Sequence, residues 1–248
     1  MKQTSRKKVL VSSIAMMMVA TVSLGSATFA WFSQNTKATA NGVNVKTVKG
    51  SNLVLCDTNS TEASDWKSTL DLNIDDKKLE PASTKDCSNW FKAKATVYNA
   101  AATDEGGRGE VTEVTNGEAN GYYVAREFYV KSVAESIQAD FQINVKATSA
   151  EANNQLDYVR VAMKKQDGTL TQIYGNKADD KACLTSTTPE LGEQDITTAA
   201  IKGSLDLTAD EGQKVTLYIW FEGEDPECKD VNAGVDVSVD VDFTKHTA

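Results

Sequence analysis

Residues 215–243, which read VTLYIWFEGEDPECKDVNAGVDVSVDVDF, decide the fold. In residues 235–243 apolar side chains alternate with aspartate and serine, which predicts a strand with one buried and one hydrated face. Residues 215–221 are largely apolar on both faces, which is typical of a strand in the middle of a sheet. The polar segment between them contains a proline and predicts the connecting loop. The stretch therefore predicts two strands of an all-β protein.

Strand-like patterns recur along the rest of the chain, whereas helical patterns are scarce. Turns or short helices are predicted only for residues 62–70 and 190–201. Within residues 158–174 an Asp167-Gly168 pair predicts the turn of a hairpin. The other predicted strands cover residues 43–55, 90–98, 121–131 and 141–147. Together these patterns predict a single antiparallel β-sandwich or jelly roll with one or two short helices.

The first thirty residues differ in character from the rest. Their only charged residues are Lys2, Arg6, Lys7 and Lys8, and residues 9–30 are uncharged. The uncharged stretch ends in small residues, and a cut between Ala30 and Trp31 fits the pattern of an export signal. We therefore expect residues 1–30 to be a signal peptide and residues 31–248 to form the single domain. Retention as a membrane anchor is the alternative, because the stretch is long enough to span a bilayer.

Composition excludes several functional classes. The chain has 248 residues and a formal net charge of −9, and removal of the basic signal segment would make it more acidic. A nucleic-acid-binding protein needs a basic face, so that role is not expected. The one histidine, His246, cannot supply a zinc-peptidase site or a histidine-dependent nucleophilic centre. We therefore expect no enzymatic activity.

Four cysteines follow the signal segment, and an even number in an exported chain favours disulfides. Three pairings are open, of which the spacing favours a local bridge in each half, Cys56–Cys87 and Cys183–Cys228. Free thiols are the main alternative. A metal site is disfavoured, because the chain has no CxxC pair and no histidine near any cysteine.

Two further groups of residues are candidates for binding. Carboxylates near the C-terminal strand are weak Ca²⁺ candidates, since Ca²⁺ takes oxygen ligands, although a solvated acidic face explains them as well. These are Asp225, Glu227, Asp240 and Asp242. Aromatic residues on predicted strands are candidates for a sugar-stacking face, and core packing is the alternative. These are Tyr122, Tyr123, Tyr129, Tyr218 and Trp220. We expect no cofactor other than this weak Ca²⁺ candidate.

The region around the predicted cut, SATFAWFSQNTKATANGVNVK at residues 26–46, resembles the camelysin/TasA family of exported Gram-positive proteins. Signal peptides of that family end in a G-G-T-x-A-x-F type sequence and are removed by a SipW-type signal peptidase. The match runs from Gly25 to Phe32, with Ser26 and Ala27 where the family often has a second glycine. Residues 79–93 and 217–243 also resemble related exported proteins of clostridial-type bacteria.

The resemblance implies a fibre subunit of the biofilm matrix that assembles by donor-strand complementation. In this mode the mature N-terminal segment of one subunit adds as a strand to the sheet of the next, and the contact propagates into a filament. The expected donor segment is residues 31–41, with Gly42 as the hinge before the next strand. Its expected donor residues are Trp31, Phe32, Ala38 and Ala40. Alternatively, Trp31 and Phe32 cap the subunit's own core or serve only in recognition by the peptidase.

The family also includes a described metallopeptidase, camelysin, but His246 alone cannot supply its ligands. The main alternative to the fibre subunit is a secreted carbohydrate- or surface-binding module. We expect an extracellular location, at the cell surface or in the biofilm matrix. The expected partners are further copies of the chain, with the signal peptidase during export. Contact with the membrane is expected only through the signal segment before cleavage.

Overall fold

The computed structural model describes residues 39–47, 52–72, 74, 77–93, 111–148, 156–176, 191–196, 200–223, 225, 228 and 236–247. Residues 1–38 lie outside these ranges, as do Cys183 and Glu227. The predictions of a signal peptide, of a cut between Ala30 and Trp31, and of donor residues Trp31, Phe32 and Ala38 therefore fall outside the described residues. In the described ranges no helix is both long and apolar enough to cross a membrane.

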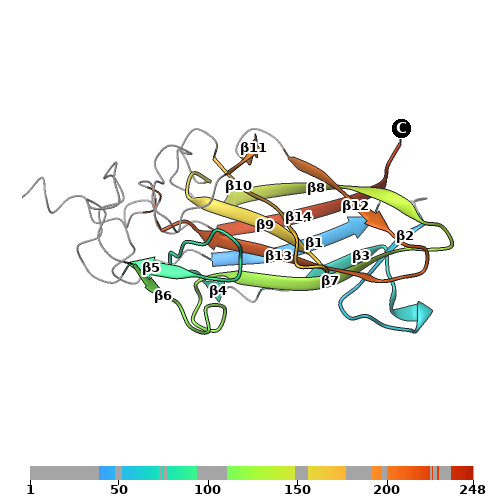
Figure 1. Cartoon of the computed structure of the whole chain (residues 1–248), viewed down its shortest axis with the longest axis horizontal. Coiled ribbons are helices and arrows are strands. Elements are labelled where there is room, and N and C mark those ends of the chain that lie inside the picture. The colour runs from blue at the N-terminus through green and yellow to red at the C-terminus, as the bar shows by residue number, and fades with distance from the viewer. Residues whose placement is uncertain are drawn as a thin grey trace, which may run out of the picture.

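The described residues form two six-stranded sheets packed face to face, which confirms the predicted all-β sandwich (Figure 1). Sheet A has the order β12 (Ile201–Leu207), β8 (Ile137–Thr148), β14 (Asp236–Lys245), β1 (Thr39–Thr47) and β3 (Thr69–Leu72), and β4 (Lys77–Lys78) also pairs with β1. Sheet B has the order β11 (Leu191–Asp195), β10 (Leu170–Gly175), β9 (Val159–Lys165), β13 (Gln213–Phe221), β7 (Val124–Ser132) and β2 (Leu53–Cys56). A small separate pair consists of β5 (Phe91–Ala93) and β6 (Val111–Glu113).

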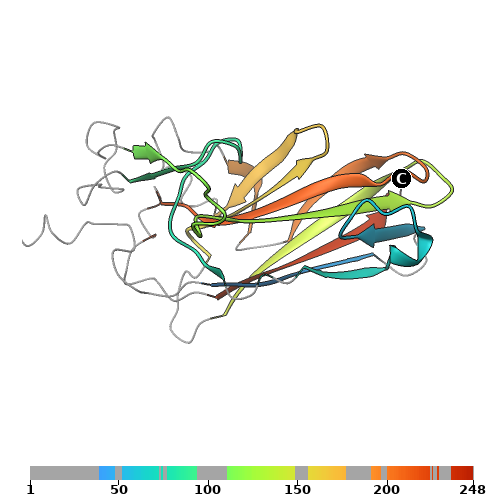
Figure 2. The same ribbon diagram turned by 90° about the horizontal axis from the view of Figure 1, so that it is seen from below.

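The core lies between the two sheets, which Figure 2 shows as separate layers. On β14 the inward side chains Val237, Val239, Val241 and Phe243 are fully buried, and the intervening residues face water, as the alternation predicts. Strand β13 pairs with both β7 and β9, so its predicted central position is confirmed. The predicted hairpin is also confirmed, because β9 and β10 pair and Gly168 in their turn has a φ of +85°.

Two predictions need correction. Residues 191–195 are not helical but form β11, which runs parallel to β10 and leads into the buried Ile196. The sheets are mixed and not purely antiparallel, because β1 also pairs in parallel with β14. In both cases pairing with another strand outweighs the weak local preference. The predicted turn within residues 62–70 is confirmed as a single 3₁₀ turn, η1 (Ala63–Asp65), before β3 begins.

Gly203 on β12 fits closely against an aromatic side chain of the neighbouring strand. It faces Phe141 across the β12–β8 ladder, and a Cβ at this position would lie 2.3 Å from Phe141 Cζ. Phe141 is only 2% exposed and packs beside Phe243, so its ring has little room to move. The aromatic ring thus occupies the space that a side chain would take at position 203.

We expect Gly203→Ala to lower the free energy of unfolding by about 1–3 kcal/mol, because the added methyl group overpacks the core. Urea unfolding followed by tryptophan fluorescence measures the change. The double variant Gly203→Ala with Phe141→Leu should recover part of the loss. An unchanged or raised stability in the single variant would contradict the close packing.

Candidate functional site

The N-terminal strand places two of the predicted assembly residues inside the subunit's own sheet. Ala40 is fully buried on β1, opposite Val237 of β14 and Lys77 of β4. Gly42, with a φ of +140°, lies at the register shift between Ala40 and Val43, so it forms a bulge within β1 and does not precede the strand. The predicted donor segment of residues 31–41 therefore has to be shortened, since the subunit itself uses the residues from Thr39 onward.

On one lateral side of the sandwich, backbone hydrogen bonds link the two sheets. Leu55 on β2 exchanges two of them with Lys67, at 2.7 and 2.8 Å. The next residue, Ser68, accepts a hydrogen bond of 2.8 Å from the backbone N–H of Thr47 on β1. The segment that joins β2 to β3 therefore connects the edge of sheet B to sheet A, where β3 is the last strand.

On the opposite side, the described residues cover β12 at Lys202 alone. The side-chain amide of Gln194 accepts a hydrogen bond of 2.6 Å from the Lys202 N–H and donates one of 2.7 Å to the Lys202 carbonyl. Because backbone groups alternate in direction along a strand, those of Ser204 and Asp206 also point away from β8. Within the described ranges these outward groups have no partner, so β12 presents an open edge from Ser204 to its end.

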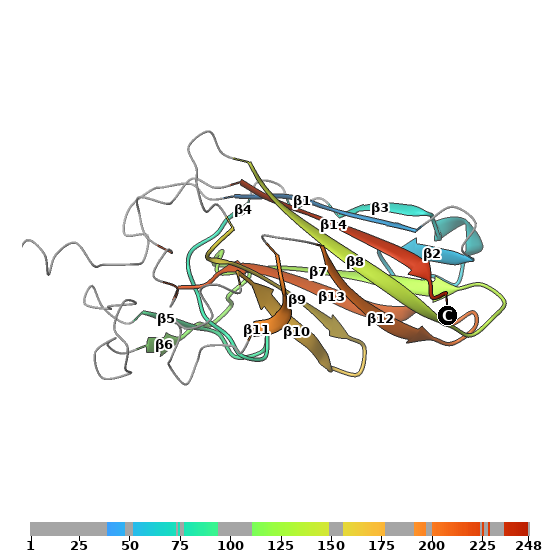
Figure 3. The same ribbon diagram turned by 90° about the horizontal axis from the view of Figure 1, so that it is seen from above.

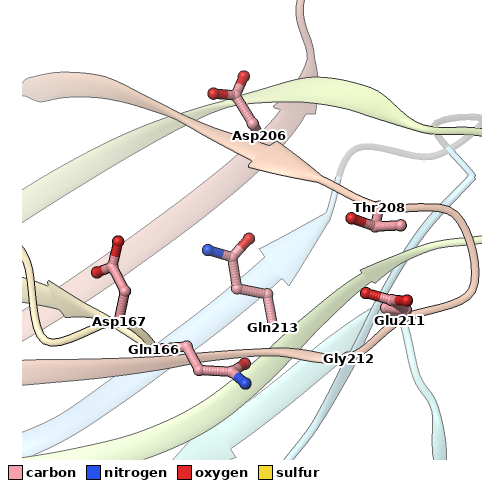
Figure 4. A pocket seen from close by; sticks show the side chains of 7 residues that line it. All are labelled: Gln166, Asp167, Asp206, Thr208, Glu211, Gly212 and Gln213. Atoms are coloured by element: carbon pink, nitrogen blue, oxygen red, sulfur yellow. The ribbon is translucent and has the colours of Figure 1, made fainter.

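A groove of about 500 Å³ lies beside this open edge (Figure 4). It is formed by the β9–β10 turn, the end of β12 and the turn into β13. Its lining residues are Gln166, Asp167, Asp206, Thr208, Glu211, Gly212 and Gln213. Figure 4 shows the amide of Gln213 in the space between β12 and the β9–β10 turn. The groove thus follows the gap between the edge of sheet A and the face of sheet B.

Local hydrogen bonds fix the turns that form the groove. Asp167 Oδ1 accepts a hydrogen bond of 2.8 Å from the Thr169 N–H, and this bond lowers the pKa of Asp167. Gln166 Oε1 accepts a hydrogen bond of 3.0 Å from the Lys214 N–H, which ties the hairpin to β13. In the turn before β13, Asp210 accepts a hydrogen bond from the Ala134 N–H at 3.1 Å. The groove is therefore built on ordered turns.

The groove is acidic. Three of its lining residues, Asp167, Asp206 and Glu211, are carboxylic acids, and none is a lysine or arginine. Asp206 lies at the rim, where its carboxylate accepts a hydrogen bond of 3.2 Å from Gln138. No group of three or more histidine, cysteine or acidic residues in the described part of the chain could hold a metal ion. An open strand edge beside an acidic groove suits an extended, positively charged peptide.

Three of the four Ca²⁺ candidates lie in the described residues, and each of these lies beside a cation. Asp240 pairs with Lys146 at 2.5 Å, and this hydrogen bond lowers the pKa of Asp240. Asp242 Oδ1 accepts no hydrogen bond but lies 3.3 Å from the ammonium group of Lys46. Asp225 is buried away from both, in an ion pair with Arg160. Each described carboxylate is thus matched by its own cation.

The predicted Cys56–Cys87 bridge is wrong. Both residues are buried free thiols. Cys56 ends β2 opposite Tyr129, which itself faces Lys214, whereas Cys87 packs in a cluster with Trp220. Tyr218 also packs against the cluster of Cys87, and positions 214 and 218 are about 13 Å apart along β13, still beyond the reach of a disulfide. Figure 3 shows the corresponding separation of β2 from β5. The Cys183–Cys228 pairing stays a prediction, because Cys183 lies outside the described residues.

The aromatic residues do not form the predicted stacking face. Trp220 and Tyr122 are buried, and Tyr123 is covered by Trp90, whose ring stacks on it at 4.1 Å. Trp90 also meets Trp220 edge to face at 5.3 Å. These rings form a second, smaller core on the outer face of sheet B, under the segment that contains β5. The alternative interpretation as core packing is therefore correct for the buried rings.

A buried polar cluster was not predicted from the sequence. The Arg160 side chain is 1% exposed and pairs with the fully buried Asp225 at 2.7 Å. It also donates hydrogen bonds to the carbonyls of Asp157 and Val159, at 2.6 and 3.1 Å. Nearby, the buried Glu222 accepts a hydrogen bond of 3.3 Å from Trp220 Nε1. The cluster fastens the segment after β13 to sheet B.

Comparison with known proteins adds no assignment to this geometry. No protein-family model matches the chain. No curated protein matches it either. The features of this chain that bear on its function are therefore the open edge of β12 and the acidic groove beside it.

Proposed function

We propose that the protein is an exported structural subunit of surface or biofilm-matrix fibres. Subunits assemble when residues 31–38 of one copy, freed by cleavage before Trp31, add as a strand to the sheet of the next. The observation that carries this proposal is the open backbone edge of β12, because strand addition needs unpaired N–H and C=O groups. The short, lightly charged composition of residues 31–38, WFSQNTKA, supports it.

The contact would be heterologous, since the donor segment and the acceptor edge are different parts of the chain. Such a contact does not close on itself, and it propagates into a filament. On the opposite side, Lys67 already pairs with Leu55 at the edge of sheet B. One donor and one acceptor in each subunit give a linear fibre.

The test uses the full chain expressed with its export machinery. Edman sequencing identifies the first residue of the secreted protein, and negative-stain electron microscopy with sizing chromatography measures assembly. We expect the wild-type protein to begin at Trp31 and to form filaments. A variant without residues 31–38 but with the signal retained should stay monomeric and show the same far-UV circular dichroism. Monomers alone from a correctly processed wild-type chain at high concentration would reject the proposal.

A second candidate function, binding of a polysaccharide or another surface ligand, is favoured by a hollow of about 670 Å³ on the outer face of sheet A. Its lining includes Gln138, Gln142, Lys202 and Thr244, which are side chains suited to hydroxyl-rich ligands. A pull-down with insoluble cell-wall polysaccharide separates the two functions, because a fibre subunit need not bind it. If the protein binds the polysaccharide and Gln142→Ala does not, the binding site is the hollow.

A further inference from the structure

We infer that the acceptor of the donor segment is the β12 edge of a second copy, and that the acidic groove holds the amino group created by cleavage before Trp31. This inference rests on the proposed function. It adds where the segment binds, in which direction it runs, and why a cleaved chain is needed.

The reach of the chain excludes binding within one copy. Strand β8 gives the distance along sheet A. Thr39 is level with Thr148 of β8, since both are paired with Asp236. The groove residue Asp206 is paired with Gln138 of β8. Positions 138 and 148 are about 33 Å apart at ~3.3 Å per residue. The eight residues 31–38 span at most about 29 Å even when fully extended. Trp31 therefore cannot reach the groove of its own subunit, and only another copy can fill it.

Charge decides the direction of the added strand. The acidic groove lies at the end of β12, next to Asp206 and Thr208, whereas the other end of the edge is occupied by Gln194 at Lys202. Residues 31–38 contain no acidic side chain, and a free α-amino group is protonated at neutral pH. Placing Trp31 at the groove, with the residues that follow it running toward Ser204, pairs this ammonium with the carboxylates. The added strand then runs antiparallel to β12.

The same geometry makes cleavage a condition of assembly. Before the cut, residue 31 carries a neutral peptide bond and a preceding apolar segment. Such a chain offers no ammonium to Asp167 and Glu211, and its continuation would have to pass through the groove. Cleavage supplies the charge and removes the obstruction together.

The test measures binding of two synthetic peptides of sequence WFSQNTKA, labelled at the C-terminus, one with a free amino group and one acetylated. The acceptor is the full processed chain, freed of filaments by centrifugation, and the readout is fluorescence anisotropy. We expect the free peptide to bind about tenfold more tightly than the acetylated one, because a charge-assisted contact is lost on acetylation. The double variant Asp167→Asn with Glu211→Gln should weaken the free peptide about tenfold and leave the acetylated one unchanged. Asp71→Asn, on the far edge strand β3, is the matched control and should change neither.

A proline variant tests the strand edge itself. Ser204→Pro removes an N–H that points away from β8, so the subunit's own ladder is kept while strand addition is blocked. It should abolish peptide binding and filaments, whereas Ser204→Ala, which keeps the N–H, should behave as wild type. Equal binding of the two peptides, or filaments from Ser204→Pro, would overturn the inference. If wild-type filaments still form in that case, the proposed function stands with another acceptor. If the processed wild type forms no filaments and binds neither peptide, both proposals fail.

Discussion

Replacing Arg160 by methionine is expected to lower the free energy of unfolding by about 3–5 kcal/mol. The substitution leaves the fully buried Asp225 without the guanidinium that lies 2.7 Å away, and removal of one partner of a buried ion pair leaves a charge in a medium that cannot solvate it. The carbonyls of Asp157 and Val159 also lose a donor. Urea unfolding followed by tryptophan fluorescence measures the loss.

Two companion variants separate the buried charge from the loss of side-chain volume. Arg160→Met with Asp225→Leu removes both charges and should recover much of the stability, because a hydrophobic pair of similar volume replaces a buried ion pair at small cost. Lys146→Met breaks the exposed pair with Asp240 and should change stability little, since solvent screens exposed pairs. A loss in Arg160→Met no larger than that in Lys146→Met would show that the buried pair does not stabilise the fold.

Replacing Trp220 by alanine is expected to cost about 3–5 kcal/mol, as is usual when a large aromatic side chain is removed from a core. Trp220 is fully buried, packs edge to face against Trp90, and donates a hydrogen bond to Glu222. Its loss opens a cavity in the smaller core on sheet B and removes a donor from a buried carboxylate. Near-UV circular dichroism should lose intensity together with the stability.

Trp220→Phe is the control, because it keeps most of the packing and removes only the N–H donor. Its loss should be about 1–3 kcal/mol, the usual cost of depriving a buried acceptor of a partner. Tyr129→Ala, at a partly exposed position of the same sheet face, should cost less than either. If Trp220→Ala and Tyr129→Ala were equally mild, the second core would contribute little to stability.

The strands were predictable wherever burial alternates along the chain. Val237 to Phe243 and the hairpin at Gly168 follow directly from period two and turn chemistry. Strand β11 was missed because its short sequence has no such pattern, and it is held by a parallel neighbour and by the burial of Ile196. The local sequence of a strand does not indicate which distant strand will pair with it.

The site was less predictable than the fold. The groove brings Asp206 and Glu211, which flank the β12–β13 turn, together with Asp167 of the distant β9–β10 turn, and no sequence pattern indicates that meeting. Asp225 was placed in a solvated loop because its sequence surroundings are polar, whereas the partner that buries it lies 65 positions away. The edge of β12 is open because β12 is the last strand of sheet A. That position follows from the pairing of the whole sheet and not from the sequence of β12.

The place of β1 in sheet A has a consequence for the order of folding. Its seven parallel partners on β14 lie almost two hundred positions further along the chain. Strand β14 is also one of the two neighbours of β8. Contacts of such long range form slowly, since a large loop must close before they contribute. Sheet A therefore cannot be completed until residues 236–245 have been made. Until then β1 lacks the strand that joins it to β8, whereas sheet B needs no residue beyond Phe221.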